Sequence, residues 1–323
     1  MPEVNCRGPV RLRHETSSFV GRRAAVKGVK RVLSTSRLVT LTGPGGIGKS
    51  QLALRVAQDL RRAFPGGVYL VDLADVRDPE SVAATVAATL GLECAARCDP
   101  ETLLVDYLRD RRALVVLDNC EHVRGACCRQ ADRLLTAAAD LHLLATSQAP
   151  LDARAEHVWP VPPLSVPDTD DPDLLRSPQQ HEALALFEQR AAAVSRGFTV
   201  NRDNRAAVAR LCQRLDGNPL AIELAALRMM ALSVDQVLDR LDSPFQLLTT
   251  GSRIARPSHR TLRAAQDRSF ELCSPIERTL WARCSVFAGD FDLDAAESAR
   301  VPAGGSPRRR CSPEWPDYSI CPC

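Results

Sequence analysis

The sequence predicts an α/β fold in its first half, a parallel sheet with helices on both faces, followed by an all-α part. Apolar runs of strand length alternate with helical segments as far as residue 147. A glycine-rich loop joins the first of these runs directly to a helical segment. Beyond residue 180 the apolar residues keep a helical period, which predicts helices rather than more sheet.

The predicted strands are short apolar runs of the kind found in buried parallel sheets. They cover residues 37–42, 67–73, 113–118 and 141–147. The segments between them have helical periodicity, and helices are expected over residues 50–64, 79–92, 100–110 and 130–139. Strands and helices that alternate in this way pack as a sheet between two helical layers.

The pattern changes near Val158, where the stretch VWPVPPLSVPDTDDPD is rich in Pro and Asp and is expected to be a linker. Helices are expected over 180–195 and 205–215, and a third begins at Pro219, where a missing N–H costs nothing. After a polar break, residues 261–299 are expected to be mostly helical. The predicted organisation is an extension (1–15), an α/β domain (16–165), a helical part (166–250), a second mostly helical part (251–299) and a tail (300–323).

Composition narrows the class of protein. Of the 323 residues, 45% are hydrophobic and 25% charged, and the net charge of +3 is too small for a nucleic-acid-binding surface over the whole chain. The N-terminus lacks the apolar stretch of a secretory signal, and no run is long enough to span a bilayer. The twelve cysteines show no paired zinc spacing, so they are expected to be incidental thiols of a cytoplasmic protein.

Residues 43–50, GPGGIGKS, fit the phosphate-binding pattern G-x-x-x-x-G-K-S/T without a mismatch. Glycines let the backbone turn its N–H groups around a phosphate, and the positive end of the following helix faces the anion. Lys49 would reach the phosphates and the Ser50 hydroxyl would bind Mg²⁺. Only three lysines occur among 42 basic residues, which makes this one more informative. The alternative, a glycine-rich turn with an accidental Lys-Ser, does not account for the flanking strand and helix.

A second metal ligand is expected at Asp118, which ends an apolar strand, where open α/β sheets place their ligand-binding groups. The alternative for this carboxylate is capping of the next helix. Among the residues that follow, Asn119 could position water but cannot take its proton. Glu121 is either the base or a first-turn acid favoured by the helix dipole. Because the strand 67–73 lies in sequence between the two motifs, the pattern fits NTPases with a strand inserted between the phosphate-loop and metal strands.

With these residues placed, the chain resembles the signal-transduction ATPases with numerous domains, relatives of the NB-ARC ATPases, and within them the ATPase core of large LuxR-type regulators. The similar segments run in family order from about Thr16 to Ala299. They are SSFVGR over the adenine, LTGPGGIGKS and LVVLDNCEHV at the phosphates and metal, LLATSQAPL as sensor strand, LDGNPLAIELAA as the helical-subdomain motif, and the start of a winged helix from Arg260.

The resemblance implies that residues 16–165 form a nucleotide-binding domain, 166–250 a helical subdomain and 251–299 a partial winged-helix subdomain. It also implies ATP or ADP with Mg²⁺ as the bound cofactors. The residues expected to bind nucleotide are Val20, Gly21, Arg22, Gly43, Gly45, Gly46, Ile47, Gly48, Lys49, Ser50, Gln51, Gln148, Pro219 and Leu220. Ser50 and Asp118 are expected to bind the metal, and Lys49, Asp118, Asn119 and Glu121 to serve any hydrolysis.

The resemblance further implies that nucleotide is a switch: ADP holds the subdomains closed, exchange for ATP opens them, and turnover is slow. Two alternatives stay open, an inert nucleotide-binding fragment and a P-loop phosphotransferase. The phosphotransferase lacks support because helical and winged-helix segments follow where substrate and lid segments are needed. Self-association or a partner protein is left open, and neither a DNA-binding domain nor a membrane partner is expected.

Three departures from the family pattern stand out. Gln148 follows Thr-Ser where an arginine able to reach the γ-phosphate is usual, which weakens γ-phosphate sensing and hydrolysis. Arg268 stands where an aromatic residue is usual. The repeats and DNA-binding helix-turn-helix of full-length relatives have no match after Arg300, so a truncated or frame-shifted gene product is one hypothesis for this chain.

Overall fold

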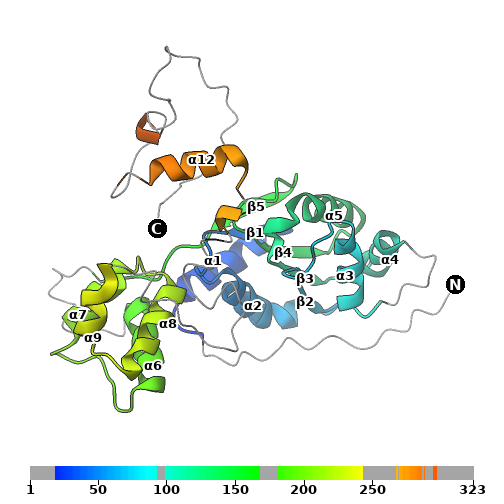
Figure 1. The fold of residues 1–323 in the computed structure, drawn as a ribbon. Coiled ribbons are helices and arrows are strands. Elements are labelled where there is room, and N and C mark those ends of the chain that lie inside the picture. Colours follow the sequence, from blue (N-terminus) through cyan, green and yellow to red (C-terminus); the bar gives the residue numbers. More distant parts are fainter. Residues whose placement is uncertain are drawn as a thin grey trace, which may run out of the picture. The chain divides into compact units, whose positions relative to one another are not determined.

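The computed structural model describes residues 19–92, 99–167, 181–242, 267, 269–271, 273–285, 287 and 294–296. The chain divides into two compact units, residues 1–266 and 267–323. The first unit contains the sheet, its covering helices and a separate group of helices (Figure 1).

The first unit is built on a five-stranded parallel sheet with the order β2-β3-β4-β1-β5. The predicted α/β class is therefore confirmed. Each of the four predicted strands is present, and the buried ones read as almost continuous apolar runs because helices cover both faces. The strands are β1 (Leu38–Thr42), β2 (Val68–Asp72), β3 (Leu114–Asp118), β4 (His142–Thr146) and β5 (Glu156–Pro160).

One strand does lie between β1, which leads into the phosphate loop, and β3, which ends at Asp118. That strand is β4, which pairs with both neighbours. The strand that lies between the two motifs in sequence, β2, is instead at the edge of the sheet and pairs only with β3. Order along the chain and order across the sheet therefore differ, as expected for parallel strands joined by crossover helices.

The predicted linker from Val158 is wrong at its start, because β5 occupies Glu156–Pro160 and pairs in parallel with β1. Its side chains are half-buried or exposed, so it lacks the apolar run that identifies a central strand. Pro160 is compatible with this position, since an edge strand leaves one side of its backbone unpaired. The Pro-rich stretch becomes irregular only after this residue.

Helices cover the two faces of the sheet with separate cores. One core joins α3, α4 and α5 to one set of strand residues, among them Val115 and Leu143. The other joins α1 and α2 to the opposite set, among them Val116 and Leu144. The helices are α1 (Arg23–Leu33), α2 (Lys49–Leu60), α3 (Ser81–Thr89), α4 (Pro100–Leu108) and α5 (Arg124–Ala137), and short 3-10 turns cover η1 (Arg61–Ala63) and η2 (Cys120–His122).

A third core lies in the helices that follow the sheet, where Phe187, Val208, Ile222 and Val237 are fully buried. These helices are α6 (Glu182–Val194), α7 (Arg205–Arg214), α8 (Pro219–Leu227) and α9 (Val234–Asp239), with 3-10 turns η5 (Arg228–Met230) and η6 (Arg240–Asp242). The helices predicted at 180–195, 205–215 and from Pro219 are all present.

The second unit contains α12 (Pro275–Cys284), which starts with a capping box between Ser274 and Glu277. Arg268, the tail after Arg300, Ser17, Ser18 and the cysteines at 94, 98, 321 and 323 lie outside the described residues. No helix within the described ranges combines the length and hydrophobicity needed to cross a bilayer.

Candidate functional site

The phosphate loop connects β1 to α2 at the carboxyl edge of the sheet. Gly43, Gly46 and Gly48 all have positive φ, the left-handed region in which a side chain would be strained. Gly48 is the N-cap of α2, and no side chain caps this helix end. Among the described residues, the backbone N–H groups of Gly45, Gly46 and Gly48 have no hydrogen-bond partner, so the loop presents donors for an anion.

Lys49, the first residue of α2, folds back over the loop. Its Nζ donates to the carbonyl oxygens of Gly43 (2.7 Å) and Pro44 (3.0 Å). Burial lowers the pKa of Lys49 to about 8, and the carboxylates of Glu121 and Asp118 partly oppose this by favouring the charged form. A phosphate beside this ammonium would favour its charged form further.

Asp118 is at the centre of the site, at the end of β3 and 8% exposed. Its Oδ1 accepts hydrogen bonds from the Ser50 hydroxyl (2.6 Å) and from the Thr146 hydroxyl (2.5 Å). Burial raises the pKa of this carboxyl, whereas the two hydroxyl donors act in the opposite direction. The alternative role, capping of the following helix, is wrong, because no side-chain cap is present at η2 or α5.

Asn119 joins the ends of β2 and β3. Its Nδ2 donates to Asp118 Oδ2 (3.1 Å) and to Asp72 Oδ1 (3.2 Å), and its backbone N–H donates to the Thr146 hydroxyl (2.9 Å). The residue has a φ of 64°, the left-handed region that asparagine tolerates better than most side chains. This amide is therefore fixed with its nitrogen toward two carboxylates, and its oxygen is left as the acceptor.

Glu121 lies in the 3-10 turn η2, close enough to Lys49 and Asp118 to affect the pKa of both. It is therefore near the phosphate loop, although the α-helix predicted from residue 130 begins six residues earlier, at Arg124. Gln148 lies in a bend just after β4 and is half-buried, and Gln51 is exposed in the first turn of α2.

The predicted adenine segment, Val20 to Arg22, lies against both the loop and the helical part. The Arg22 guanidinium donates through Nη2 to the carbonyls of Ile47 and Pro162, and its backbone N–H donates to Glu182. A side chain at Gly21 would come within 2.8 Å of Glu182, so glycine permits this approach. Burial lowers the pKa of Arg22, and the Glu182 carboxylate opposes that shift.

The start of α8 brings Pro219 and Leu220 to the loop. The Leu220 backbone N–H lies 3.3 Å from the Gly46 carbonyl oxygen. A Cβ at Gly46 would lie 2.8 Å from Leu220 Cβ, and one at Gly48 would lie 3.8 Å from Pro219 Cγ. The site is therefore assembled from two parts of the first unit, the sheet and the helices that follow it.

The residues present fit a nucleotide with magnesium. A glycine cradle with unpartnered N–H donors and an adjacent ammonium suits phosphate oxygens. A hydroxyl and a carboxylate in contact, Ser50 and Asp118, supply the oxygen ligands that Mg²⁺ prefers. Nη1 of Arg22 is buried without a hydrogen-bond partner, so one donor beside the loop is left for a polar ligand atom.

The structure adds residues that the sequence analysis missed. Thr146 and Asp72 complete the hydrogen bonds around Asp118 and Asn119, and Glu182 and Asn218 organise the helical side. A polar residue at the end of each of the strands β2, β3 and β4 was the signal that could have identified the first two. No local signal marks Glu182, because its contact spans 160 residues of chain.

The family model described as "AAA domain" matches residues 31–152. The uncharacterized protein Rv0894 of Mycobacterium tuberculosis (strain ATCC 25618 / H37Rv) is 40% identical over 302 residues, which cover 92% of this chain and 72% of that protein. Rv0890c of the same strain, named as a candidate HTH-type transcriptional regulator, is 40% identical over 86% of this chain and 30% of its own length.

Regulatory protein AfsR of Streptomyces coelicolor (strain ATCC BAA-471 / A3(2) / M145) is 36% identical over 34% of this chain and 13% of that protein. A solved signal transduction ATPase with numerous domains from Pyrococcus horikoshii, which has a tetratricopeptide repeat sensor, covers 88% of this chain and 37% of that one, with 14% identity and a TM-score of 0.43. The predicted resemblance to regulator ATPases is confirmed by the sequence matches: the chain belongs to the family of AAA-type P-loop ATPases that includes Rv0894.

Proposed function

We propose that this chain is the nucleotide-dependent conformational switch of a regulatory ATPase, with slow Mg-dependent ATP hydrolysis at most. The observation that carries the proposal is the contact between the phosphate loop and the start of α8, where Leu220 N–H approaches the Gly46 carbonyl. A ligand in the loop is then in reach of the helical part. Its binding energy can favour one packing of the two parts over another.

A second link supports the same proposal. The Arg22 guanidinium contacts the loop carbonyl of Ile47, while the backbone of the same residue contacts Glu182 on α6. The two parts that move in this proposal are the nucleotide-binding domain, 16–165, and the helical subdomain, 166–250. Nucleotide would be held where their contacts meet.

Each site residue has a role in this proposal. Lys49 and the loop N–H groups would hold the phosphates, with Val20, Arg22 and Pro219 near the base. Ser50 and Asp118 would hold magnesium, which when bound neutralises phosphate charge. Thr146 keeps Asp118 in place, and Asn119 orients water. Slow turnover is supported by Gln148, which carries no charge to stabilise a γ-phosphate during hydrolysis.

The relatives support a regulatory role, since Rv0890c and AfsR are both named as regulators. This chain spans only 30% of Rv0890c and 13% of AfsR, so the regulatory output of those longer proteins is part of the proposal here.

The test has two measurements on the full chain. Identification of the nucleotide that copurifies, followed by timing of ATP loss, is expected to give tight ADP and turnover well below typical enzyme rates of about 10 per second. Hydrogen exchange at α8 is then compared between ADP and a non-hydrolysable ATP analogue, and the switch predicts different protection in the two states.

The two measurements separate the alternatives. Equal protection of α8 with both nucleotides would leave an inert nucleotide-binding fragment. Many turnovers with a phosphorylated small-molecule product would instead indicate a phosphotransferase and overturn the switch.

A further inference from the structure

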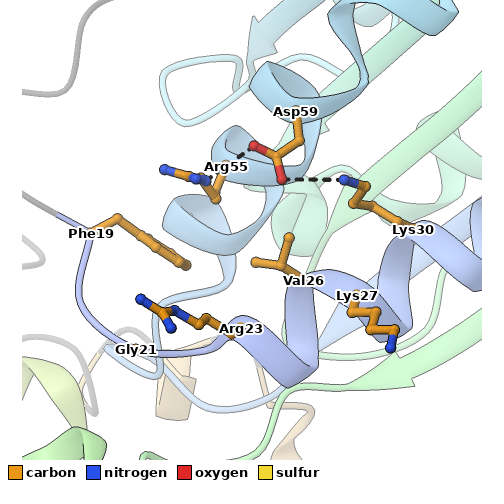
Figure 2. A pocket seen from close by; sticks show the side chains of 8 residues that line it. All are labelled: Phe19, Gly21, Arg23, Val26, Lys27, Lys30, Arg55 and Asp59. Atoms are coloured by element: carbon orange, nitrogen blue, oxygen red, sulfur yellow. Dashed lines mark hydrogen bonds and ion pairs between the residues drawn. The ribbon is translucent and has the colours of Figure 1, made fainter. Parts of the chain in front are cut away.

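A cleft of about 500 Å³ lies between α1 and α2, next to the site described above (Figure 2). Its volume is within the range of about 300–1,000 Å³ that small-molecule sites occupy. Phe19 and Val26 give it an apolar side, and the other side chains that reach it are charged. The lining residues are Phe19, Gly21, Arg23, Val26, Lys27, Lys30, Arg55 and Asp59.

Positive charge dominates the cleft, with four cations against the single carboxylate of Asp59. That carboxylate is shared by two of the cations, Lys30 Nζ at 3.3 Å and Arg55 Nε at 3.2 Å, as the dashed lines of Figure 2 show. Within the described part of the chain, Arg23 and Lys27 have neither an ion pair nor a hydrogen bond from their side chains. The cleft therefore holds more positive charge than its own acid can balance.

The start of α1 adds to this imbalance. The helix has Arg22 as N-cap with no side-chain cap, Arg23 as its first residue, and no acid in its first turn. Cations at the positive end of a helix dipole are unfavourable, whereas an anion there is stabilised. Two of the three lysines of the whole sequence, Lys27 and Lys30, follow on this same helix and line the cleft. An anion in the cleft would balance the excess of positive charge and would also interact favourably with the N-terminus of α1.

The cleft and the nucleotide site draw on one segment, and Gly21 belongs to both. Phe19, Gly21 and Arg23 line the cleft. Val20, between them, packs against the core of the helical part, and Arg22 donates to the phosphate loop. The cations of the cleft are therefore distinct from Lys49 and from the loop N–H groups.

We propose that this cleft binds a small polyphosphorylated molecule, a compact ligand with two or more phosphoryl groups. Guanidinium forks pair with phosphate oxygens through two parallel hydrogen bonds, and ammonium groups add point charges. Phe19 offers its ring to a less polar part of the ligand; the Arg55 guanidinium already lies 5.9 Å from the ring centroid. The proposal does not depend on the proposed nucleotide switch, because the cations that would bind this ligand are not those of the phosphate loop.

The test is calorimetric titration of the full chain with magnesium-free inorganic tripolyphosphate. It is carried out on Lys49→Ala, in which the phosphate loop has lost its ammonium group, and again on the wild-type chain saturated with ADP. In both, the double variant Arg23→Gln/Lys27→Gln is compared with Arg31→Gln/Arg61→Gln. The two control positions are exposed on α1 and η1, lie outside the cleft, and change the net charge equally.

The expected result is one binding site whose affinity falls about tenfold or more in the cleft variant and changes less than about twofold in the control. Absence of binding, or equal losses in the two variants, would overturn the proposal. Tighter binding of a single-stranded 12-nucleotide DNA, dependent on Arg23 and Lys27, would also overturn it in favour of a nucleic-acid contact. Circular dichroism of each variant establishes that its fold is intact.

Discussion

Two helices of the first unit, α2 and α8, begin in contact with each other. They differ in whether a side chain caps the N–H groups of the first turn. Asn218 caps α8, accepting hydrogen bonds from the N–H groups of Leu220 (3.0 Å) and Ala221 (3.3 Å), and Pro219 occupies the first turn. Gly48 precedes α2 and offers no side chain, and no acid occupies its first turn. One helix end is complete by itself, whereas the other presents donors to a ligand.

The difference shows how a few residues decide whether the N-terminus of a helix is capped by the chain itself or is left to bind a ligand. Asn-Pro satisfies two N–H groups and removes a third, so α8 needs nothing more. Gly-Lys satisfies none, and the lysine meanwhile donates to the loop carbonyls of Gly43 and Pro44. Stability is therefore expected to depend on Asn218 and ligand affinity on Lys49. The following predictions test that division.

The largest effect is expected for Lys49→Ala. Two charge-assisted hydrogen bonds to phosphate are lost, so ADP affinity should fall about 100-fold, or about 3 kcal/mol. The sheet should stay folded, because the Lys49 side chain contributes to no core. Titration with fluorescent ADP checks the affinity, and near-normal binding would show that the loop is not the phosphate site.

Gly46→Ala is expected to strain the contact between the two helix ends. A Cβ there would lie 2.8 Å from Leu220 Cβ, and the φ of 81° is itself unfavourable for alanine. The expected loss is about 2 kcal/mol of unfolding free energy, with weaker ADP binding, measured by urea unfolding and titration.

Gly125→Ala is the matched control for this change. Its added Cβ would meet only Arg129 Nη1 at 3.6 Å, an ordinary contact within α5. Helix propensity then favours alanine by up to about 1 kcal/mol. Equal destabilisation of both variants would remove the Gly46 contact from the explanation.

ADP affinity should also depend on pH through Lys49, whose pKa in the free protein is lowered to about 8 by burial. A bound phosphate favours the ammonium, so binding takes up a proton above that pH. The affinity of magnesium-free ADP should fall about tenfold from pH 7 to pH 9, or about 1.4 kcal/mol. Calorimetry in buffers of different ionisation enthalpy measures the proton uptake directly.

The lowered pKa of Lys49 also determines how the free energy of unfolding changes with pH. The unfolded lysine keeps its usual pKa of 10.5, so between about pH 8 and 10.5 the unfolded chain binds more protons. Without ligand, the contribution of Lys49 to stability therefore rises with pH across that window. In Lys49→Arg the side chain stays charged throughout, so the pH dependence of ADP affinity and that of stability should both disappear. A pH profile that this variant leaves unchanged would contradict the assignment.

The smallest effect is expected at the other helix end. Asn218→Ala should reduce unfolding free energy by about 1 kcal/mol, because the Ala221 N–H loses its acceptor and the Leu220 N–H keeps only its longer bond to the Gly46 carbonyl. Asn218→Ser keeps a capping oxygen and should recover most of the loss. If alanine instead changed ADP affinity more than stability, the proposed division between the two helix ends would be wrong.

The sequence predicted the elements with strong local patterns. The four apolar strands, the glycine loop and Asp118 were identified because each has a signature within a few residues. The strand β5 was not, since its exposed side chains lack an apolar pattern and its pairing partner β1 lies more than 100 residues away. Its pairing is a tertiary contact, which local patterns do not encode.

The site shows the same limit. The hydroxyl of Thr146 reaches Asp118 only because β4 is inserted between β1 and β3, an order that sequence position does not give. Asp72 reaches Asn119 because β2 and β3 pair in register, with Asp72 opposite Asp118. Residues that depend on strand order were missed, whereas residues within a motif were found.

The five residues from Phe19 to Arg23 touch the basic cleft, the phosphate loop and Glu182 on α6. Because the stretch is short, a movement of its backbone at one of these three contacts would strain the other two. Occupancy of the cleft and occupancy of the phosphate loop should therefore influence each other reciprocally. Through this stretch, a cellular metabolite could set how firmly the protein retains its nucleotide.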